Sequence, residues 1–167
     1  MKLLIHDLPE ALFQDLGDDF EIIDTNVRAI PCQGCFKCWT KNAGYCVYAD
    51  ALQHSGAAVG NSEEVIVVSQ ICYGGYSRSI KRFFDRGISD SLPFLTYRKR
   101  KTYHKNRYET KRRLTVYFYG NCSEFERETA REYVECHAVN MDADGYEVVF
   151  IECVENIEEK ICARYKS

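Results

Sequence analysis

The sequence has little proline and glycine and no long hydrophobic run. Three prolines and ten glycines account for 13 of 167 residues, too few for a linker or a low-complexity chain. No uninterrupted apolar stretch exceeds four residues, so we expect no segment that spans a bilayer. The residues after Met1 also lack the apolar region of a secretory signal. We therefore expect one cytoplasmic domain over residues 1–167, with 46% hydrophobic residues to build its core.

Charge is distributed unevenly along the chain. Residues 98–113 contain nine Lys or Arg and one acid, Glu109, for a local net charge of +8. Because the whole chain carries −3, the other 151 residues carry −11, which disfavours a general nucleic-acid binder. The basic segment is either a contact for an anionic ligand, partner or single strand of nucleic acid, or a solvated excursion that serves as a dimer arm against residues 124–135. We favour the second interpretation, because runs of charge usually face water.

Five short apolar runs alternate with segments of helical periodicity, and their order predicts the fold. The runs lie at residues 2–6, 20–24, 64–69, 114–120 and 146–152. Helices are expected over about 50–59, 77–88, 123–141 and 156–167. This alternation predicts an α/β fold with a doubly wound, five-stranded parallel sheet and helices on both faces. The basic segment 96–113 is then an insertion between the third helix and the fourth strand.

Local patterns add detail to these elements. The run 65–68 is continuously apolar and β-branched, as in a strand buried on both faces, whereas 114–120 alternates with polar residues and is expected nearer an edge or a cleft. Ser123 and Glu126 have the spacing of a capping box at a helix start. Side chains at every fourth position follow: Phe125, Thr129, Tyr133, His137 and Met141. Only 13 residues, 7–19, connect the first two strands, near the minimum for a parallel connection.

Four cysteines follow the second predicted strand in the pattern C-x2-C-x2-C-x7-C. They are Cys32, Cys35, Cys38 and Cys46. Spacing by two residues lets consecutive sulfurs converge on one centre, as in iron–sulfur loops and zinc knuckles, so one interpretation of the set is a [4Fe–4S] site. The alternative is a tight loop whose free thiols pack beneath Trp39 and Phe36. Nine cysteines indicate a reducing compartment, and the other five are expected in the core: Cys72, Cys122, Cys136, Cys153 and Cys162.

A pair of glycines follows the third predicted strand and opens directly into a helix. The loop reads Gln70-Ile71-Cys72-Tyr73-Gly74-Gly75-Tyr76-Ser77. Ligands of doubly wound sheets bind beyond the carboxyl ends of the strands, here after His6, Asp24, Ser69 and Gly120. The glycines let backbone amides approach a ligand, and Tyr73 and Tyr76 could stack on a flat ring. The alternative is an ordinary strand-to-helix turn.

These two loops together resemble those of a known family. C-x-G-C-x-x-C-W at residues 32–39, and Tyr-Gly-Gly-x-Ser running into Ile80-Lys81-Arg82-Phe83-Phe84-Asp85-Arg86, are similar to flavodoxin-like flavoproteins. The relevant branch contains the NAD(P)H-dependent FMN reductases and the iron–sulfur flavoproteins. The resemblance covers about residues 20–120, with matching element order on either side. It implies a flavodoxin-like three-layer sandwich, FMN as cofactor, NAD(P)H as electron donor and, in the iron–sulfur members, a [4Fe–4S] cluster.

The resemblance also assigns cofactor contacts and partners. The loop after the third strand would hold the ribityl chain and pyrimidine edge of FMN through backbone amides, with Trp39 and Tyr76 beside the ring. The implied cofactor-binding residues are Ser69, Tyr73, Gly74, Gly75, Tyr76, Ser77, Trp39, Gly120 and Asn121. No catalytic acid, base or nucleophile is required, because the cofactor carries the redox chemistry. A homodimer or a paired flavoprotein partner is implied, with small-molecule electron donors and acceptors.

One position departs from the family pattern. The family places a loop rich in Ser, Thr, Gly and Asn after the first strand to hold the FMN phosphate, but this chain has His6-Asp7-Leu8-Pro9-Glu10-Ala11. A phosphate dianion needs amide donors and positive potential, whereas Asp7 and Glu10 are negative and Pro9 has no amide proton. We therefore expect the phosphate pocket to be weakened or lost.

Three functions follow from these observations. The first is an FMN-dependent oxidoreductase or electron-transfer protein that uses NAD(P)H. The second is a flavodoxin-like scaffold that has lost FMN and acts as a partner or regulatory subunit, which the altered first loop favours. The third is an anion- or nucleic-acid-binding protein that uses residues 98–113, and it rests on composition alone.

Overall fold

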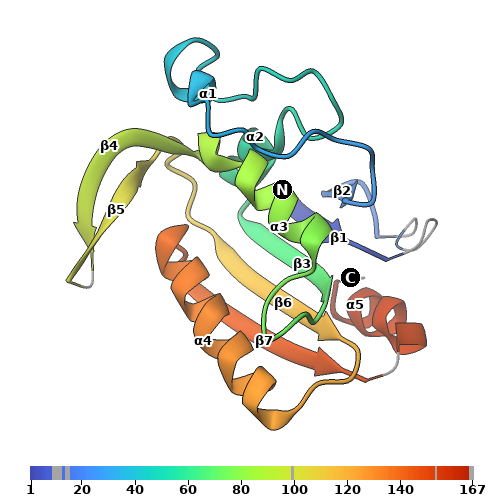
Figure 1. Ribbon diagram of the computed structural model, residues 1–167. Coiled ribbons are helices and arrows are strands. Elements are labelled where there is room, and N and C mark those ends of the chain that lie inside the picture. The colour runs from blue at the N-terminus through green and yellow to red at the C-terminus, as the bar shows by residue number, and fades with distance from the viewer. Residues whose placement is uncertain (9–12, 14–15, 99, 153, 166–167) are drawn as a thin grey trace.

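A sheet of five parallel strands forms the centre of the protein. The computed structural model describes residues 1–8, 13, 16–98, 100–152 and 154–165 (Figure 1). The strands are β1 (Lys2–His6), β2 (Phe20–Asp24), β3 (Glu64–Gln70), β6 (Arg113–Tyr119) and β7 (Gly145–Ile151). Their order is β2-β1-β3-β6-β7, with every neighbouring pair parallel. The predicted five-stranded, doubly wound α/β sheet is therefore confirmed, and its winding reverses between β1 and β3.

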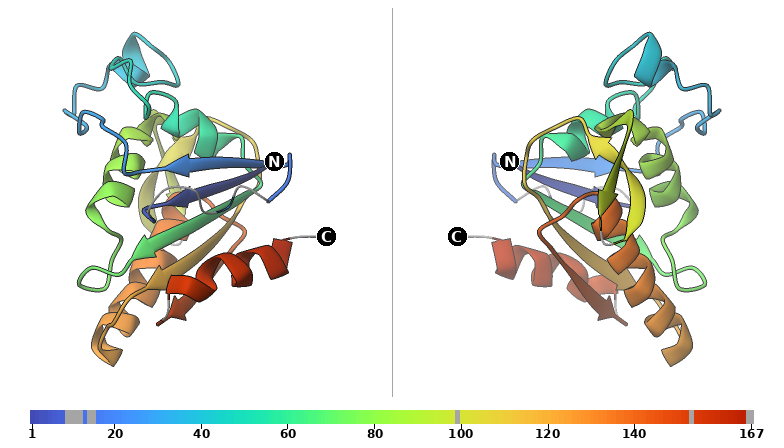
Figure 2. Two further views of the ribbon diagram at one scale, coloured as in Figure 1. Left: turned by 90° about the vertical axis from the view of Figure 1, so that its right-hand side faces the viewer. Right: turned by 90° about the vertical axis from the view of Figure 1, so that its left-hand side faces the viewer.

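Alternate strand residues point to opposite faces of the sheet, and each face has its own core. Three helices cover one face: α2 (Ser55–Gly60), α3 (Arg78–Arg86) and α4 (Glu124–Asn140). Ile5 and Val67 belong to the core beneath them. α5 (Ile157–Tyr165) covers the opposite face, where Leu4 and Ile66 share a core with Ile161 (Figure 2). The two faces together make the three-layer arrangement that the sequence predicts.

The starts of the two long helices follow from local sequence. Ser77 caps α3, because its hydroxyl accepts a hydrogen bond from the Ile80 amide at 3.5 Å. Ser123 and Glu126 form the predicted capping box at the start of α4, where the Ser123 amide donates to the Glu126 carboxylate at 2.9 Å. The predicted helix over 50–59 is reduced to α2 (Ser55–Gly60), and the last predicted helix is α5.

The core-facing side of α4 is made by small residues, and the four-residue repeat does not stay on it. Ala130, Val134 and Ala138 are buried, whereas Phe125 is 76% exposed. Residues four apart advance by about 40° around an α-helix, so such a repeat drifts from one face to another. Phe125 therefore points to solvent, while His137, three turns later, packs against the buried ring of Tyr76.

β6 is an interior strand, so of the two places expected for residues 114–120 the edge of the sheet is wrong, whereas the expected cleft lies at the end of this strand, where Tyr119 lines a pocket described below. The strand is paired with β3 on one side and with β7 on the other. Its polar positions Thr115 and Tyr117 are both buried. Tyr117 belongs to the core under α5, and Arg164 of that helix donates to the Tyr117 hydroxyl at 3.5 Å. Because α5 covers this face and supplies a polar partner for Tyr117, a strand with alternating polar and apolar residues can lie inside the sheet.

The basic segment forms a hairpin that the sequence patterns do not predict. β4 (Ser91–Arg98) pairs antiparallel with β5 (Lys101–Asn106), separately from the parallel sheet. The hairpin begins at Ser91, before the expected start of the insertion at residue 96, and extends away from the sheet (Figure 1). Its lysines and arginines are poor strand formers, which hides the strand signal. Three short helical turns complete the described elements: α1 (Lys37–Thr40), η1 (Ile88–Asp90) and η2 (Val154–Asn156).

β1 and β2 are parallel neighbours, in register from Lys2 opposite Phe20 to His6 opposite Asp24. The 13-residue connection predicted for them is therefore confirmed as a parallel crossover. Much of it lies outside the described residues, including Pro9, Glu10 and Ala11 of the altered loop. Within the described ranges, no helix combines the length and the apolar character needed to cross a membrane.

Candidate functional site

An open pocket lies at the carboxyl ends of the parallel strands, where the winding of the sheet reverses. Its volume is about 520 Å³. The lining side chains come from the segments after β1, β2 and β3, from the end of β6 and from the start of α3. They are Asp7, Asn26, Gln70, Cys72, Ser77, Arg78, Ser79, Arg82 and Tyr119. Doubly wound sheets bind their ligands at this position, so we take this strand-end pocket as the candidate site.

Asp7 is the central polar group of the strand-end pocket. Its carboxylate accepts hydrogen bonds from the Gln70 amide at 3.1 and 3.2 Å, and the Ser77 and Tyr119 hydroxyls also donate to it. Burial raises the pKa of Asp7, and these donors oppose the shift. Burial and the Asp7 carboxylate together raise the pKa of Tyr119, which keeps that phenol protonated. Asp7 therefore occupies donors from two neighbouring strand ends that an anionic ligand would otherwise use.

The glycine pair forms a closed turn rather than an open loop. The amides of Cys72 and Gly75 each donate to the carbonyl of the other residue, at 2.9 and 3.0 Å. At the tip, the amides of Tyr73 and Gly74 form no hydrogen bond within the part of the chain that the structure describes. The Tyr73 side chain is 95% exposed. Two amides and one aromatic ring at the tip are thus free to meet a ligand.

Glycine is required at position 74 for a structural reason that is independent of any ligand. Its φ is 76°, in the left-handed region that favours glycine. A Cβ at this position would meet the Thr129 side chain of α4 at 2.7 Å. At Gly75 the nearest atom would be 3.6 Å away, an ordinary contact. The close approach of α4 therefore requires the first glycine of the pair and tolerates a side chain at the second.

Ser69, Ser77 and Tyr76, three of the predicted contacts, serve the protein interior. The Ser77 amide donates to the Ser69 hydroxyl at 2.9 Å, which joins the end of β3 to the start of α3. Tyr76 is 1% exposed, and its hydroxyl is 3.0 Å from Nδ1 of His137. Burial raises the pKa of Tyr76 and lowers that of His137 to about 4, so both side chains are neutral near pH 7. The Tyr76 ring therefore does not line the strand-end pocket, although Ser77 does.

The last three predicted contacts lie in two different places. Gly120 follows β6 with a φ of 101°, and the neighbouring Asn121 is exposed. The turn lies next to this loop, since the Ile71 amide donates to the Tyr119 carbonyl at 3.0 Å. Trp39 lies at the opposite end of α3, where its indole N–H donates to the Ile88 carbonyl at 3.2 Å. The fold thus brings the turn and Gly120 together but leaves Trp39 apart from them.

Sequence reasoning missed Asn26, Arg78 and Arg82, which also line the strand-end pocket. Arg82 donates to the carbonyls of Thr25 at 2.6 Å and Val27 at 2.8 Å, so it holds the segment after β2 against α3. Arg78 is exposed one turn earlier on the same helix. Two arginines four residues apart at a helix start lie on one side of the helix, and this spacing was a signal available in the sequence.

The four motif cysteines line one small, largely apolar cavity of about 120 Å³. Cys38 is buried, Cys46 is half-buried, and Cys32 and Cys35 are exposed. Burial raises the pKa of the Cys38 thiol, and the nearby sulfurs of Cys46, Cys32 and Cys35 raise it further. Among the described residues, no three Cys, His, Asp or Glu side chains are arranged around a single metal ion. The four cysteines therefore line a common cavity, but among the described residues they are not arranged as ligands of a single metal ion.

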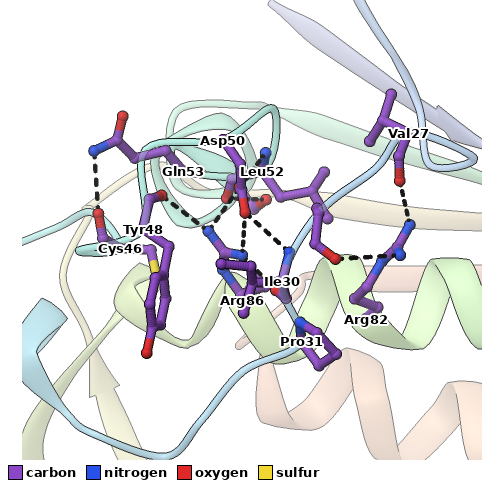
Figure 3. Close-up of polar contacts among 12 residues, drawn as sticks. Val27, Ile30, Pro31, Cys46, Tyr48, Asp50, Leu52, Gln53, Arg82 and Arg86 are labelled. Carbon is purple, nitrogen blue, oxygen red and sulfur yellow. Dashed lines mark hydrogen bonds and ion pairs between the residues drawn. The ribbon is translucent and has the colours of Figure 1, made fainter.

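A buried arginine at the end of α3 holds the cysteine loop in place (Figure 3). The Arg86 guanidinium donates to the two carboxylate oxygens of Asp50 at 2.8 and 2.9 Å. It also donates to the carbonyls of Ile30 and Tyr48. Burial alone would raise the pKa of Asp50, but Arg86 and the Ile30 amide bring it below its ordinary value. Arg86 therefore attaches both ends of residues 30–48 to α3, and its bidentate pair with Asp50 strengthens this attachment.

The remaining cysteines are not all core residues. Cys72, Cys122 and Cys162 are half-buried, and Cys72 lines the strand-end pocket. Cys136 is exposed on α4, so the expectation that it packs in the core is wrong. It lies on the side of the helix opposite Ala130 and Val134. Cys153 lies outside the described residues.

A second hollow, of about 530 Å³, lies at the far end of α3 between the cysteine loop, the hairpin and α4. Asp90 lines it, with a carboxylate oxygen 3.6 Å from the fully buried guanidinium of Arg112. Burial raises the pKa of Asp90 to about 6, and the positive charge of Arg112 opposes this shift. Cys32 and Gly34 of the cysteine motif also line this hollow, which is remote from the strand ends.

Comparison with known proteins relates the chain to one fold. No protein-family model matches the sequence, and no curated protein matches it. Among solved structures, an NAD(P)H:quinone oxidoreductase from Methanothermobacter marburgensis matches with a TM-score of 0.58 and 11% identity, over 99% of this chain and 92% of that one.

Two further solved structures contain FMN. An FMN-dependent NADH-azoreductase from Bacillus anthracis, in complex with FMN, matches with a TM-score of 0.58 and 10% identity, over 99% of this chain and 97% of that one. General stress protein 14 from Treponema denticola, also in complex with FMN, matches with a TM-score of 0.56 and 9% identity, over 99% and 93%. At such low identity the similarity establishes the fold, which is the flavodoxin-like sandwich that the sequence resemblance implies.

Replacing Arg86 by leucine should destabilise the protein, because Asp50 and two carbonyls would lose their buried donor. We expect the free energy of unfolding, measured by urea denaturation, to fall by about 3–5 kcal/mol. Arg78→Leu is the matched control on the same helix, and because Arg78 is exposed it should change stability by less than about 0.5 kcal/mol. Equal losses for the two variants would contradict the role of Arg86 as the anchor of the cysteine loop.

Proposed function

We propose that the protein is a flavin-dependent oxidoreductase of the NAD(P)H-dependent FMN reductase type. The strand-end pocket carries this proposal, because it lies where a flavodoxin-like sheet reverses its winding. Structurally similar proteins include an NAD(P)H:quinone oxidoreductase and an azoreductase that is FMN-dependent. We extend that cofactor and that electron donor to this chain. A bound flavin supplies the hydride and electron chemistry, so the chain has to hold and orient the ring.

The residues at the strand ends fit the ring and ribityl parts of a flavin. Tyr73 and Gly74 do not line the pocket, but they belong to the same turn as its lining residue Cys72, and their two free amides and the exposed Tyr73 ring could extend the contact surface for a flavin. Asn26 and Gln70 line the pocket and carry carboxamide groups, which can both donate and accept hydrogen bonds. The pocket volume of about 520 Å³ lies within the range of about 300–1,000 Å³ that is usual for ligand sites.

The same residues do not fit the FMN phosphate. Asp7 places a carboxylate in the pocket and uses the Gln70 amide and the Ser77 hydroxyl for itself. Arg82 lines the pocket, but its guanidinium is engaged by backbone carbonyls. Arg78 is the other cation of the lining. We therefore propose that contacts to the ring and ribityl chain dominate flavin binding, and we assign no step to the phosphate.

Tyr73→Ala should weaken flavin binding without affecting stability, because the side chain is almost fully exposed. Stacking on an aromatic ring contributes about 1–3 kcal/mol, so the Kd for FMN should rise at least about fivefold. Binding is measured by the quenching of flavin fluorescence. NADH-dependent reduction of a quinone by the flavin-loaded protein should fall in parallel.

Tyr146→Ala, at an exposed tyrosine at the start of β7, is the matched control and should leave flavin binding unchanged. Gly74 is a poor test position, because a side chain there would also collide with Thr129. If the wild-type protein binds neither FMN nor riboflavin after reconstitution, the oxidoreductase proposal fails. The scaffold without a cofactor would then be the better interpretation.

Asp7→Asn should increase the preference for FMN over riboflavin. The substitution removes a negative charge from the pocket but keeps an oxygen that can accept from the Gln70 amide. Since only FMN carries a phosphate, its Kd should fall about fivefold while that of riboflavin changes little, as about 1 kcal/mol of repulsion is removed. Asp24→Asn, at a carboxylate outside the pocket lining, is the control. Equal changes for both flavins would mean that Asp7 acts through structure rather than charge.

We also propose that the cysteine cavity holds a [4Fe–4S] cluster. The supporting observation is that Cys32, Cys35, Cys38 and Cys46 all line one cavity. A four-iron cluster is larger than a single ion, so its ligands stand farther apart than single-ion geometry requires. Arg86 lines the same cavity and would offset part of the negative charge of four thiolates.

Anaerobic reconstitution with iron and sulfide tests this proposal. We expect about four irons per chain and a broad visible absorbance that bleaches in air. Cys38→Ser should lose the iron, whereas Cys136→Ser, at an exposed cysteine of α4, should retain it. A wild-type protein that takes up no iron would favour the alternative of free thiols in a tight loop.

The proposals on partners and location follow from the same features. The open strand-end pocket suits small-molecule electron donors and acceptors. Exposed thiols at Cys32 and Cys35 fit a reducing cytoplasmic compartment. A homodimer is proposed as the assembly, in keeping with the sequence resemblance.

A further inference from the structure

The second hollow, at the far end of α3, has walls from segments that are far apart in the sequence. The cysteine loop, α2, α3, η1, the base of the β4–β5 hairpin and the end of α4 all contribute lining residues. The hairpin base and the end of α4 lie together at this end of the protein (Figure 1). A volume of about 530 Å³ is within the range of about 300–1,000 Å³ that is usual for ligand sites. The hollow therefore has the size and the enclosure of a binding site.

The charge of the lining favours a positive ligand. Asp85 and Asp90 both line the hollow, and none of the described residues that line it is a lysine or an arginine. Burial raises the pKa of Asp90 to about 6, so its carboxyl group is mostly ionised at pH 7. Burial lowers the pKa of His137, another lining residue, to about 4, so its ring is neutral there. An entering molecule therefore meets negative charge.

The protein leaves hydrogen-bond acceptors of this hollow open. Among the described residues, the Asp90 carboxylate accepts no hydrogen bond, since its ion-pair partner Arg112 is 3.6 Å away. His104, which also lines the hollow, has its Nδ1 at 3.0 Å from the Leu92 carbonyl. A carbonyl only accepts, so Nδ1 donates and Nε2 is left as the acceptor of the neutral ring. A ligand that donates hydrogen bonds would thus supply what these groups lack.

Two arginines lie near Asp90, but neither lines the hollow. Arg107 donates through Nε to the Ser89 carbonyl at 2.9 Å. The side chain of Arg112 is fully buried, so a ligand cannot reach it. An anionic ligand would therefore meet the carboxylates of the lining before either guanidinium.

The remaining lining is largely aromatic and aliphatic. Phe84 lies edge-to-face with His137 at 4.5 Å, and the Tyr133 ring is 38% exposed. Ile88 and Met141 also line the hollow. Such side chains pack against a flat apolar ring, and the faces of Phe84 and Tyr133 also attract a cation. A ligand with both a ring and a positive group would use the whole lining.

We propose that the second hollow binds an arylalkylamine, a small molecule in which a short chain joins a protonated amine to a flat ring. The ammonium group would donate to the Asp90 carboxylate, while the ring packs against Phe84 and Tyr133. A bare metal ion is a poorer occupant, because no three Cys, His, Asp or Glu side chains of the described chain are arranged around one ion. The proposal does not depend on the flavin or on the cluster.

Three probes of similar size test the proposal by isothermal titration calorimetry on the full chain. They are 2-phenylethylamine, 2-phenylethanol and 3-phenylpropanoate, which are positive, neutral and negative at pH 7. The amine should bind at least about tenfold more tightly than the alcohol, because only the amine brings a charged donor to Asp90. The acid should bind more weakly than the alcohol. Equal affinities for amine and alcohol, tighter binding of the acid, or binding of none of the three would overturn the proposal.

Asp90→Asn should lower the affinity for 2-phenylethylamine at least about tenfold and leave that for 2-phenylethanol within about twofold. This variant leaves Arg112 as a buried charge without its partner, so its folding is at risk. Asp90→Asn/Arg112→Met removes both charges and should fold and lose amine affinity in the same way. Asp18→Asn, at an exposed acid outside the lining, is the matched control and should change neither affinity.

A substitution that fills the hollow gives an independent test of the location. Asn140→Trp, at an exposed residue of the lining, should weaken binding of the amine and the alcohol alike, by at least about fivefold. Glu135→Trp, exposed on the same helix but outside the lining, should change neither. Amine binding that survives both Asp90→Asn/Arg112→Met and Asn140→Trp would lie elsewhere on the protein and would overturn the proposal. The Kd for FMN should be equal in all these variants, so failure at the hollow and failure of the flavin site are separate results.

Discussion

The ion pair between Arg86 and Asp50 holds the cysteine loop against one end of α3, and so fixes where the cysteine cavity lies relative to the strand-end pocket. It lies at the end of α3, and the strand-end pocket lies at the start of the same helix. Nine residues at about 1.5 Å each separate the two ends by about 13 Å. Because Arg82 also ties the segment after β2 to α3, the chain runs along the helix and carries the cysteine loop away from the strand ends. A flavin and a cluster in one chain would therefore lie at opposite ends of α3.

The charged groups at the strand ends are also occupied by contacts within the protein. The carboxyl edge of a parallel sheet usually suits an anion, since backbone amides and helix starts converge there. In this chain Asp7 accepts from those donors, and Arg82 of α3 donates to the backbone carbonyls of Thr25 and Val27 after β2. The strand-end pocket therefore contains a carboxylate where an anion-binding site would offer free donors.

Features that depend on neighbouring residues could be predicted from the sequence. The five strands, the capping box of Ser123 and the parallel winding all follow from local periodicity and composition. Cysteine spacing predicts a shared cavity for the same reason, since residues three apart in a short loop cannot move far from one another. Local reasoning was wrong where a distant helix changes what a strand residue meets. Tyr117 in β6 looks like part of a half-exposed strand until α5 covers it.

Which helices and strands form, and in what order, follows from local sequence, because hydrophobic periodicity and helix capping involve residues within one or two turns of each other. Which side chains meet follows from the packing of these elements. Tyr76 turns into the core, Trp39 lies at the far end of α3, and Gly74 is needed because Thr129 packs against it. Asp7 meets the Gln70 amide only because β1 and β3 are neighbours in the sheet. Such contacts join residues that are distant in the chain, and they depend on how whole elements pack, which no local pattern encodes.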